Sequence, residues 1–171
     1  MNNNTTYKEK RRSLIEEREA DPDFASARRL ILVLLVIMIF FRILHVAVQM
    51  VTFPIYDVPL RLSDAIPMAM MVIVVLVFSK LIYSFGSMPF VYLAFFGGCV
   101  SFYFAWRDQL YLDFIYFDLL MKLSTAIFTF SVLTQIVVML TFIFNGKCKS
   151  YFSAMREVTQ EIKDSFKAGT G

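Results

Sequence analysis

Four long apolar runs constrain the fold of this chain more than any other feature of its 171 residues. A helix needs about 20 apolar residues to cross about 30 Å of hydrocarbon. The runs predict transmembrane helices over about residues 30–53, 66–85, 88–106 and 119–144. The predicted fold class is therefore all-α, an integral membrane bundle of four transmembrane helices.

The composition fits a membrane protein with two polar tails. Hydrophobic residues make up 58% of the chain and charged residues 18%, whereas an ordinary soluble domain has about 45–50% and about 25%. This balance excludes disordered, collagen-like and disulfide-scaffold classes. The distribution predicts three regions: a charged cytosolic tail over residues 1–29, a transmembrane domain over 30–146, and an amphipathic cytosolic helix over 147–171.

Lys and Arg gather in the two tails, and cytoplasmic segments of membrane proteins carry such an excess. We therefore expect cytoplasmic N- and C-termini in a multi-pass protein of the plasma (cytoplasmic) membrane, with the lipid bilayer as a partner. The aromatic segment over 110–118 is expected at the outer interface, as an aromatic belt or a docking surface. The basic tail residues are Lys8, Lys10, Arg11, Arg12, Arg18, Arg28, Arg29, Lys147, Lys149, Arg156, Lys163 and Lys167.

The first apolar run contains a polar stripe. At 100° per residue its members fall within an arc of about 80°, and the first of them lies about 18 Å into the bilayer. A charge at that depth costs about 2.5–3.5 kcal/mol, so the stripe should face protein or water. It either fixes helix register by hydrogen bonding or lines a water-filled or ligand-contacting cavity. Its members are Arg42, His45, Gln49 and Thr52.

Arg42 has no carboxylate partner within any of the four runs. Its expected partners are hydroxyls and carbonyls at the same depth, such as those of Ser101, Tyr103 or Thr129, or the same groups in another copy of the chain. His45, the only histidine, cannot form a multi-ligand metal site alone. It is interpreted as an interhelical hydrogen-bonding residue, with protonation sensing as the alternative.

The third and fourth runs carry further patterned residues. Small residues on one side of the third run predict close helix packing, within the chain or between copies. Two polar rows on the fourth run predict contact with two polar surroundings, either a channel or an oligomer interface. The small stripe is Ala94, Gly98, Ser101 and Ala105, and the rows are Asp118, Lys122, Thr125 and Thr129, with Ser124, Ser131 and Gln135 opposite.

Both tails have helical patterns. The N-terminal tail is helix-prone from Tyr7 to Glu19, with Asp23 as the expected N-cap of the next turn. After Asn145 and Gly146, apolar residues recur at helical spacing, with both signs of charge on the opposite face. This amphipathic helix is expected to bind a protein partner, or else the membrane surface. The partner-binding stripe is Tyr151, Met155, Val158, Ile162 and Phe166.

No catalytic, cofactor or metal motif occurs in the sequence. We therefore expect no enzyme activity, no cofactor and no metal. The net charge of +3 follows from membrane topology and does not indicate nucleic acid. The predicted function is a non-enzymatic integral membrane subunit that anchors, senses for or regulates a membrane or cytosolic protein partner, as a homo-oligomer or with that partner. The alternative is an oligomeric small channel or transporter with a polar path lined by Arg42, His45 and Gln49.

Overall fold

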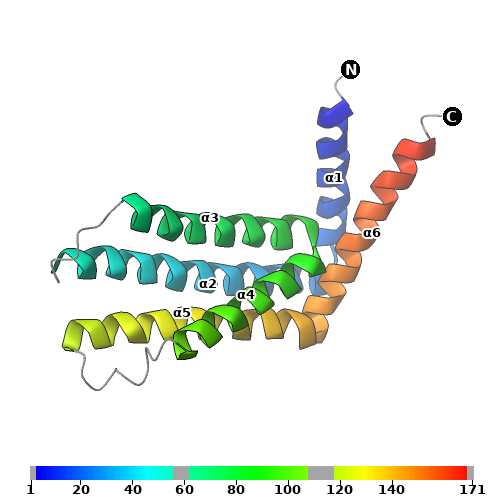
Figure 1. Cartoon of the computed structure of the whole chain (residues 1–171). Coiled ribbons are helices and arrows are strands. Elements are labelled where there is room, and N and C mark those ends of the chain that lie inside the picture. Colours follow the sequence, from blue (N-terminus) through cyan, green and yellow to red (C-terminus); the bar gives the residue numbers. More distant parts are fainter. Residues whose placement is uncertain (1–2, 56–61, 108–117, 169–171) are drawn as a thin grey trace.

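The computed structural model describes residues 3–55, 62–107 and 118–168. These ranges form helices and no strand, so the all-α prediction is confirmed for the described residues. The helices are α1 Asn3–Glu19, α2 Pro22–Ile55, α3 Leu62–Phe85, α4 Met88–Arg107, α5 Leu119–Phe144 and α6 Gly146–Ala168 (Figure 1). The predicted outer aromatic segment lies outside them as far as residue 117.

The helix bounds follow the apolar runs, with one clear exception. Helix α5 begins and ends at the predicted residues, whereas α2 begins at Pro22 and continues without a break past the predicted tail boundary at residue 29. The Asp21 carboxylate accepts the backbone N–H of Asp23 at 2.9 Å, and the Asp21 carbonyl accepts the N–H of Ala25 at 3.0 Å. The cap is therefore Asp21, and the prediction of Asp23 is wrong. Pro22 suits the first position of the helix, where no amide donor is needed.

Two of the described helices are long and apolar enough to cross a membrane. They are α2, over Pro22–Thr52, and α5, over Leu119–Phe144. The apolar stretches of α3 and α4 are shorter, Ala69–Phe85 and Met88–Phe104. Length and apolar composition thus identify two candidate spans among the four predicted ones.

Helices α2 to α5 form a bundle, and α1 and α6 leave one end of it at a steep angle (Figure 1). Helix α2 packs against α5, α3 and α6, and α4 packs against α5. The buried apolar core extends from the bundle into α6, so α6 belongs to the same folding unit. The largest side chains of this core include Ile31, Ile82, Val91, Met139, Phe142, Tyr151 and Met155.

Two short connections set the direction of α6. Asn145 donates its backbone N–H to Thr141 at 2.9 Å, while its side-chain oxygen accepts the N–H of Lys147 at 2.9 Å. Asn145 therefore ends α5 and caps α6. Gly86 links α3 to α4 with φ of 57°, and a Cβ there would lie 2.4 Å from the Met155 Cβ. Only glycine fits where α6 presses on this turn.

Candidate functional site

A buried hydrogen-bonded chain joins three helices of the bundle. The Arg42 guanidinium of α2 donates to Gln135 Oε1 of α5 at 2.7 Å. The Gln135 amide nitrogen then donates to the backbone carbonyl of Ala94 in α4, also at 2.7 Å. Arg42 and Gln135 are both buried. These hydrogen bonds fix the register of α2, α4 and α5 relative to one another, because each bond forms only at one relative position of its two helices along the bundle.

The hydroxyls predicted to pair with Arg42 are engaged elsewhere or exposed. Ser101 donates to the carbonyl of Gly97 on its own helix at 2.9 Å, and Tyr103 is 60% exposed. Thr129 likewise donates to a carbonyl of its own helix at 2.8 Å. Within the described chain, Arg42 therefore does not pair with the named hydroxyls, because the short side chains of Ser101 and Thr129 bond back to the preceding turn. The longer amide of Gln135 reaches across the interface.

His45 contacts an aromatic ring in the interior. Its side chain is 2% exposed, and its ring centroid lies 5.0 Å from that of Phe128 on α5. His45 Nδ1 is buried with no hydrogen-bond partner among the described residues. On the same stripe, buried Thr52 donates to the Val48 carbonyl at 2.7 Å, and Gln49 is half-buried. The structure thus places Arg42, His45 and Thr52 inside the bundle.

The small-residue stripe of α4 lies against α5 at its first two positions. Ala94 is buried and receives the Gln135 bond. A Cβ on Gly98 would lie 3.0 Å from Ile136 Cγ1 and 3.5 Å from Gln135 Nε2, so the missing side chain at Gly98 leaves room for these two α5 side chains. Ser101 is half-buried, and the side chain of Ala105 lies outside the described part.

The two polar rows of α5 both reach the interior of this one chain. Thr125 of one row and Ser131 and Gln135 of the other are buried. Helix α5 packs against both α2 and α4, so each row has protein neighbours without a second copy. At the helix start, Asp118 caps α5 by accepting the N–H of Met121 at 2.9 Å, and Lys122 is half-buried.

A second cluster lies where α6 meets the bundle. Tyr151 is fully buried, donates its hydroxyl to the backbone carbonyl of Tyr83 in α3, and stacks on Phe24 of α2 at 5.4 Å between centroids. Burial raises the pKa of the Tyr151 phenol well above its usual range. Nearby Cys148 is also fully buried, and burial raises the pKa of its thiol. Tyr151 therefore ties α6 to both α2 and α3 as a neutral donor.

The apolar stripe of α6 is covered by the chain's own helices. Met155, Val158 and Ile162 are fully buried in the described fold, where α1 and α2 pack against α6. The prediction that this stripe is free to bind a partner or a membrane surface is therefore wrong. The amphipathic pattern was correct, but a pattern of apolar spacing does not reveal which surface will cover it.

The end of the stripe and its flank contact α1. Phe166 is 36% exposed and its ring centroid lies 5.9 Å from that of Tyr7. Arg18 of α1 forms ion pairs with Glu157 at 3.1 Å and with Glu161 at 3.2 Å. Helices α1 and α6, hereafter the helical arm, thus form one unit that is attached to the bundle through Tyr151.

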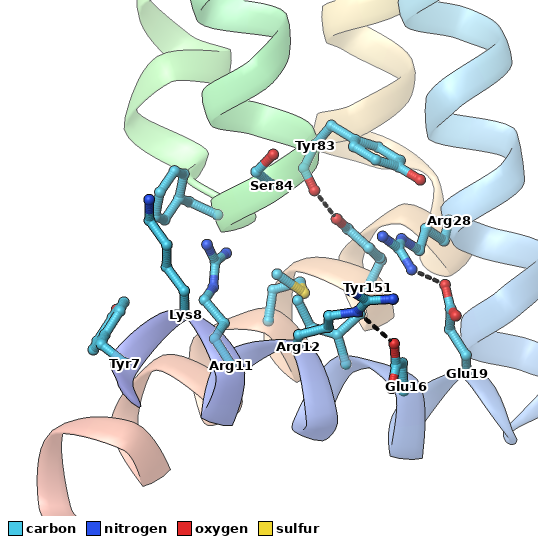
Figure 2. Close-up of a pocket in the computed structure, with 13 residues that line it drawn as sticks. Tyr7, Lys8, Arg11, Arg12, Glu16, Glu19, Arg28, Tyr83, Ser84 and Tyr151 are labelled. Carbon is cyan, nitrogen blue, oxygen red and sulfur yellow. Dashed lines mark hydrogen bonds and ion pairs between the residues drawn. The ribbon is translucent and has the colours of Figure 1, made fainter. Parts of the chain in front are cut away.

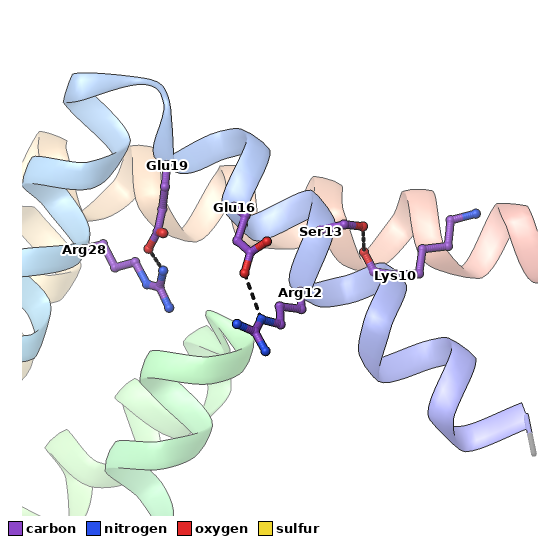
Figure 3. Close-up of polar contacts among 6 residues, drawn as sticks. All are labelled: Lys10, Arg12, Ser13, Glu16, Glu19 and Arg28. Carbon is purple, nitrogen blue, oxygen red and sulfur yellow. Dashed lines mark hydrogen bonds and ion pairs between the residues drawn. The ribbon is translucent and has the colours of Figure 1, made fainter.

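A pocket of about 640 Å³ lies between α1, the end of α3 and α6 (Figure 2). Four cations and two carboxylates are among the side chains that line it. Arg12 pairs with Glu16 at 2.8 Å, and Arg28 pairs with Glu19 (Figure 3). Sequence reasoning missed this pocket because it assigned the basic tail residues to topology alone. The spacing Tyr7, Arg11, Ile15 along one helix face was an available signal.

Within the described ranges, no group of three or more His, Cys, Asp or Glu side chains could hold a metal ion. No protein-family model, curated protein or solved structure matches this chain. Function is therefore argued from the buried polar chain, the helical arm and the pocket.

Proposed function

We propose that this protein is a non-enzymatic integral membrane subunit with four transmembrane helices, α2 to α5, and cytoplasmic termini. The helical arm would then lie on the cytoplasmic side of the plasma membrane and present its polar face to a protein partner, which the subunit anchors or regulates. The partner is a second copy of the chain or a different membrane or cytosolic protein.

The apolar surface of the bundle supports membrane insertion. Large hydrophobic side chains are exposed along the helices, and soluble monomers rarely expose contiguous apolar patches above a few hundred Å². Hydrocarbon is the solvent in which such a surface carries no penalty. The exposed residues include Val33, Val36, Phe40 and Ile43 on α2, Met70, Ile73, Val74 and Val77 on α3, and Phe130, Leu133 and Val137 on α5.

The packing of the bundle supports four spans. Helix α3 packs against α2, and α4 packs against α5. If the two long helices cross the membrane, their shorter neighbours occupy the same depth. Their apolar stretches, Ala69–Phe85 and Met88–Phe104, rise about 26 Å each at 1.5 Å per residue. This length is at the short end of the range for transmembrane helices.

The attachment of the helical arm to the bundle carries the partner-binding proposal. With its apolar stripe buried and Tyr151 bonded to Tyr83, α6 leaves the bundle in a fixed direction instead of trailing as a loose tail. The face that remains outward is polar and carries both signs of charge, as partner-selecting surfaces do. Its exposed residues are Arg156, Gln160, Lys163 and Asp164.

Site-specific photocrosslinking in living cells tests this proposal. A photoreactive residue at Gln160 should give a discrete protein adduct, which the charge reversals Arg156→Glu and Lys163→Glu should reduce severalfold. A photoreactive residue at Leu93, which is 55% exposed on α4, provides the matched control on the bundle and should not give that adduct. The mass of the adduct separates a second copy from a different protein. No protein adduct at Gln160 would contradict the proposal.

The channel alternative has less support. Its polar path required Arg42 and His45 to line an opening, but Arg42 is buried and bonded to Gln135, and His45 is buried against Phe128. Both side chains thus have protein neighbours within a single chain. Gln49, the third residue of the path, is half-buried.

A further inference from the structure

The pocket between α1, the end of α3 and α6 contains two cations that form no ion pair with a described carboxylate. Lys8 and Arg11 lie one turn apart on α1, and Figure 2 shows both side chains extending from α1 toward the end of α3. Among the described residues, neither forms an ion pair with a carboxylate. The two other cations of the pocket, Arg12 and Arg28, are already paired with Glu16 and Glu19.

Arg11 is held in an environment that favours an anion. Its Nε and one Nη are buried with no hydrogen-bond partner among the described residues, and its guanidinium carbon lies 4.1 Å from the centroid of the Phe85 ring. The ring contact satisfies none of the five N–H donors of the guanidinium. Buried donors without acceptors are costly, and a charged acceptor in the pocket would offset that cost.

The pocket has the size and the remaining groups for a phosphate ligand. Its volume of about 640 Å³ lies within the range of about 300–1,000 Å³ for small-molecule sites. Ser84 of α3 also lines the pocket and brings a hydroxyl group. The Tyr83 ring extends toward Arg28, away from Lys8 and Arg11 (Figure 2). A guanidinium and an ammonium beside hydroxyls are the groups that bind phosphate oxygens in proteins.

We propose that this pocket binds the phosphate group of an anion, through Arg11 and Lys8 of α1 and the hydroxyl of Ser84. The phosphate belongs either to a phospholipid headgroup or to a soluble phosphate. The lipid source rests on the proposed membrane placement, which puts the end of α3 at headgroup depth, where the inner leaflet is anionic. The phosphate chemistry itself does not depend on that placement.

Protection of a thiol introduced within the pocket tests the proposal locally. The full chain carrying Ser84→Cys, with Cys99 and Cys148 replaced by alanine, is purified in an uncharged detergent, and maleimide labelling of the introduced thiol is timed. Three probes are compared: inorganic phosphate, short-chain phosphatidylglycerol and short-chain phosphatidylcholine. We expect phosphatidylglycerol to slow labelling at least about tenfold, in a saturable manner. Because Ser84→Cys removes one proposed ligand, binding is also measured in the parent chain by calorimetry.

Variants of α1 separate the pocket from general surface charge. Arg11→Gln and Lys8→Gln should each weaken phosphatidylglycerol binding about tenfold, the loss of one charge-assisted contact. Lys10→Gln removes the same charge from the same helix, but Lys10, unlike the equally exposed Lys8, does not line the pocket and extends away from α3 (Figure 3). This control should bind as the parent does. Arg11→Lys retains the charge and should bind more tightly than Arg11→Gln even if α1 packs less well.

The three probes distinguish the source of the phosphate, and the α1 variants test the pocket itself. Binding of phosphatidylglycerol alone identifies a lipid headgroup, and equal binding of inorganic phosphate identifies a soluble source. Equal binding of phosphatidylcholine, equal losses in Lys10→Gln and Arg11→Gln, or no saturable binding by either anionic probe would overturn the proposal. Crosslinking at Gln160 is independent of this result, so failure of the pocket and failure of the partner-binding proposal are distinguishable.

Discussion

At the scale of single residues, the bond between Arg42 and Gln135 predicts that removing one partner destabilises the fold more than removing both. Gln135→Leu leaves the Arg42 guanidinium buried without its acceptor, so we expect the free energy of unfolding to fall by about 1–2 kcal/mol, near the upper end for hydrogen bonds in membrane proteins. Adding Arg42→Met should restore most of this loss, since replacing both partners by apolar groups removes the unpaired charge. Denaturant unfolding in detergent measures each variant.

The control for these substitutions lies on the same stripe. Gln49 is half-buried and makes no hydrogen bond to a described residue, so Gln49→Leu should change stability by less than about 0.5 kcal/mol. If Arg42→Met added to Gln135→Leu lowers stability further by its full single-mutant effect, the two side chains are not coupled. That result would contradict the hydrogen-bonded chain through α2, α5 and α4.

Tyr151 predicts a stability that depends on alkaline pH. Its phenol has a pKa raised by burial, so in the folded state it keeps its proton while the unfolded chain ionises above about pH 10. The unfolded state then binds fewer protons, and the free energy of unfolding falls as pH rises above about 10. Tyr151→Phe should cost about 1 kcal/mol at pH 8 through the lost bond to Tyr83 but should show a flatter decline between pH 10 and 12.

The Cys148 thiol also contributes to this pH dependence of stability, and the experiment must separate its effect from that of Tyr151. Burial also raises the pKa of the Cys148 thiol, which adds a decline of the same sign that begins about one pH unit lower. Unfolding is therefore measured in a Cys148→Ala background, with and without Tyr151→Phe. Identical slopes in the two proteins would show that the phenol is not buried in the folded chain.

At the scale of elements, α6 predicts opposite tolerance on its two faces. Val158 is fully buried, and Val158→Asp would bury a carboxylate without a partner, which should destabilise the chain by about 3 kcal/mol or more. Lys163 is exposed on the polar face, and Lys163→Asp should change stability by no more than about 0.5 kcal/mol. Thermal unfolding of the full chain in detergent compares the two. Equal tolerance of both substitutions would mean that α6 does not pack on α1 and α2.

At the scale of the whole molecule, the proposed set of four spans predicts which side of the membrane each connection faces. In a background with Cys99 and Cys148 replaced by alanine, Ser87→Cys in the α3–α4 turn should be labelled by an impermeant maleimide only in inverted vesicles. Leu119→Cys, at a position 84% exposed at the start of α5, should be labelled only in intact cells. Labelling of both positions from the same side would leave α3 and α4 outside the set of spans.

The sequence predicted the bounds of the helices better than the contacts between them. Apolar runs of membrane length set the bounds of α5 and most of α4, because both depend on local composition. The partner of Arg42 was missed because many polar side chains lie at suitable depth, and only the packing of α5 between α2 and α4 selects Gln135. The covering of the α6 stripe was missed for the same reason, since apolar spacing is identical whether the cover is the same chain or another.

The contact between α1 and α6 can form only late in synthesis of the chain. Arg18 and Glu161 are 143 positions apart, so α1 leaves the ribosome long before its partner helix exists. Until α6 is synthesised, Phe24 and Ala27, both buried in the finished fold, have no cover from it, and the turn at Gly86 is open. Chains that stop before α6 would therefore display apolar surface where the helical arm packs in the completed fold, and quality-control proteases could distinguish them from completed ones.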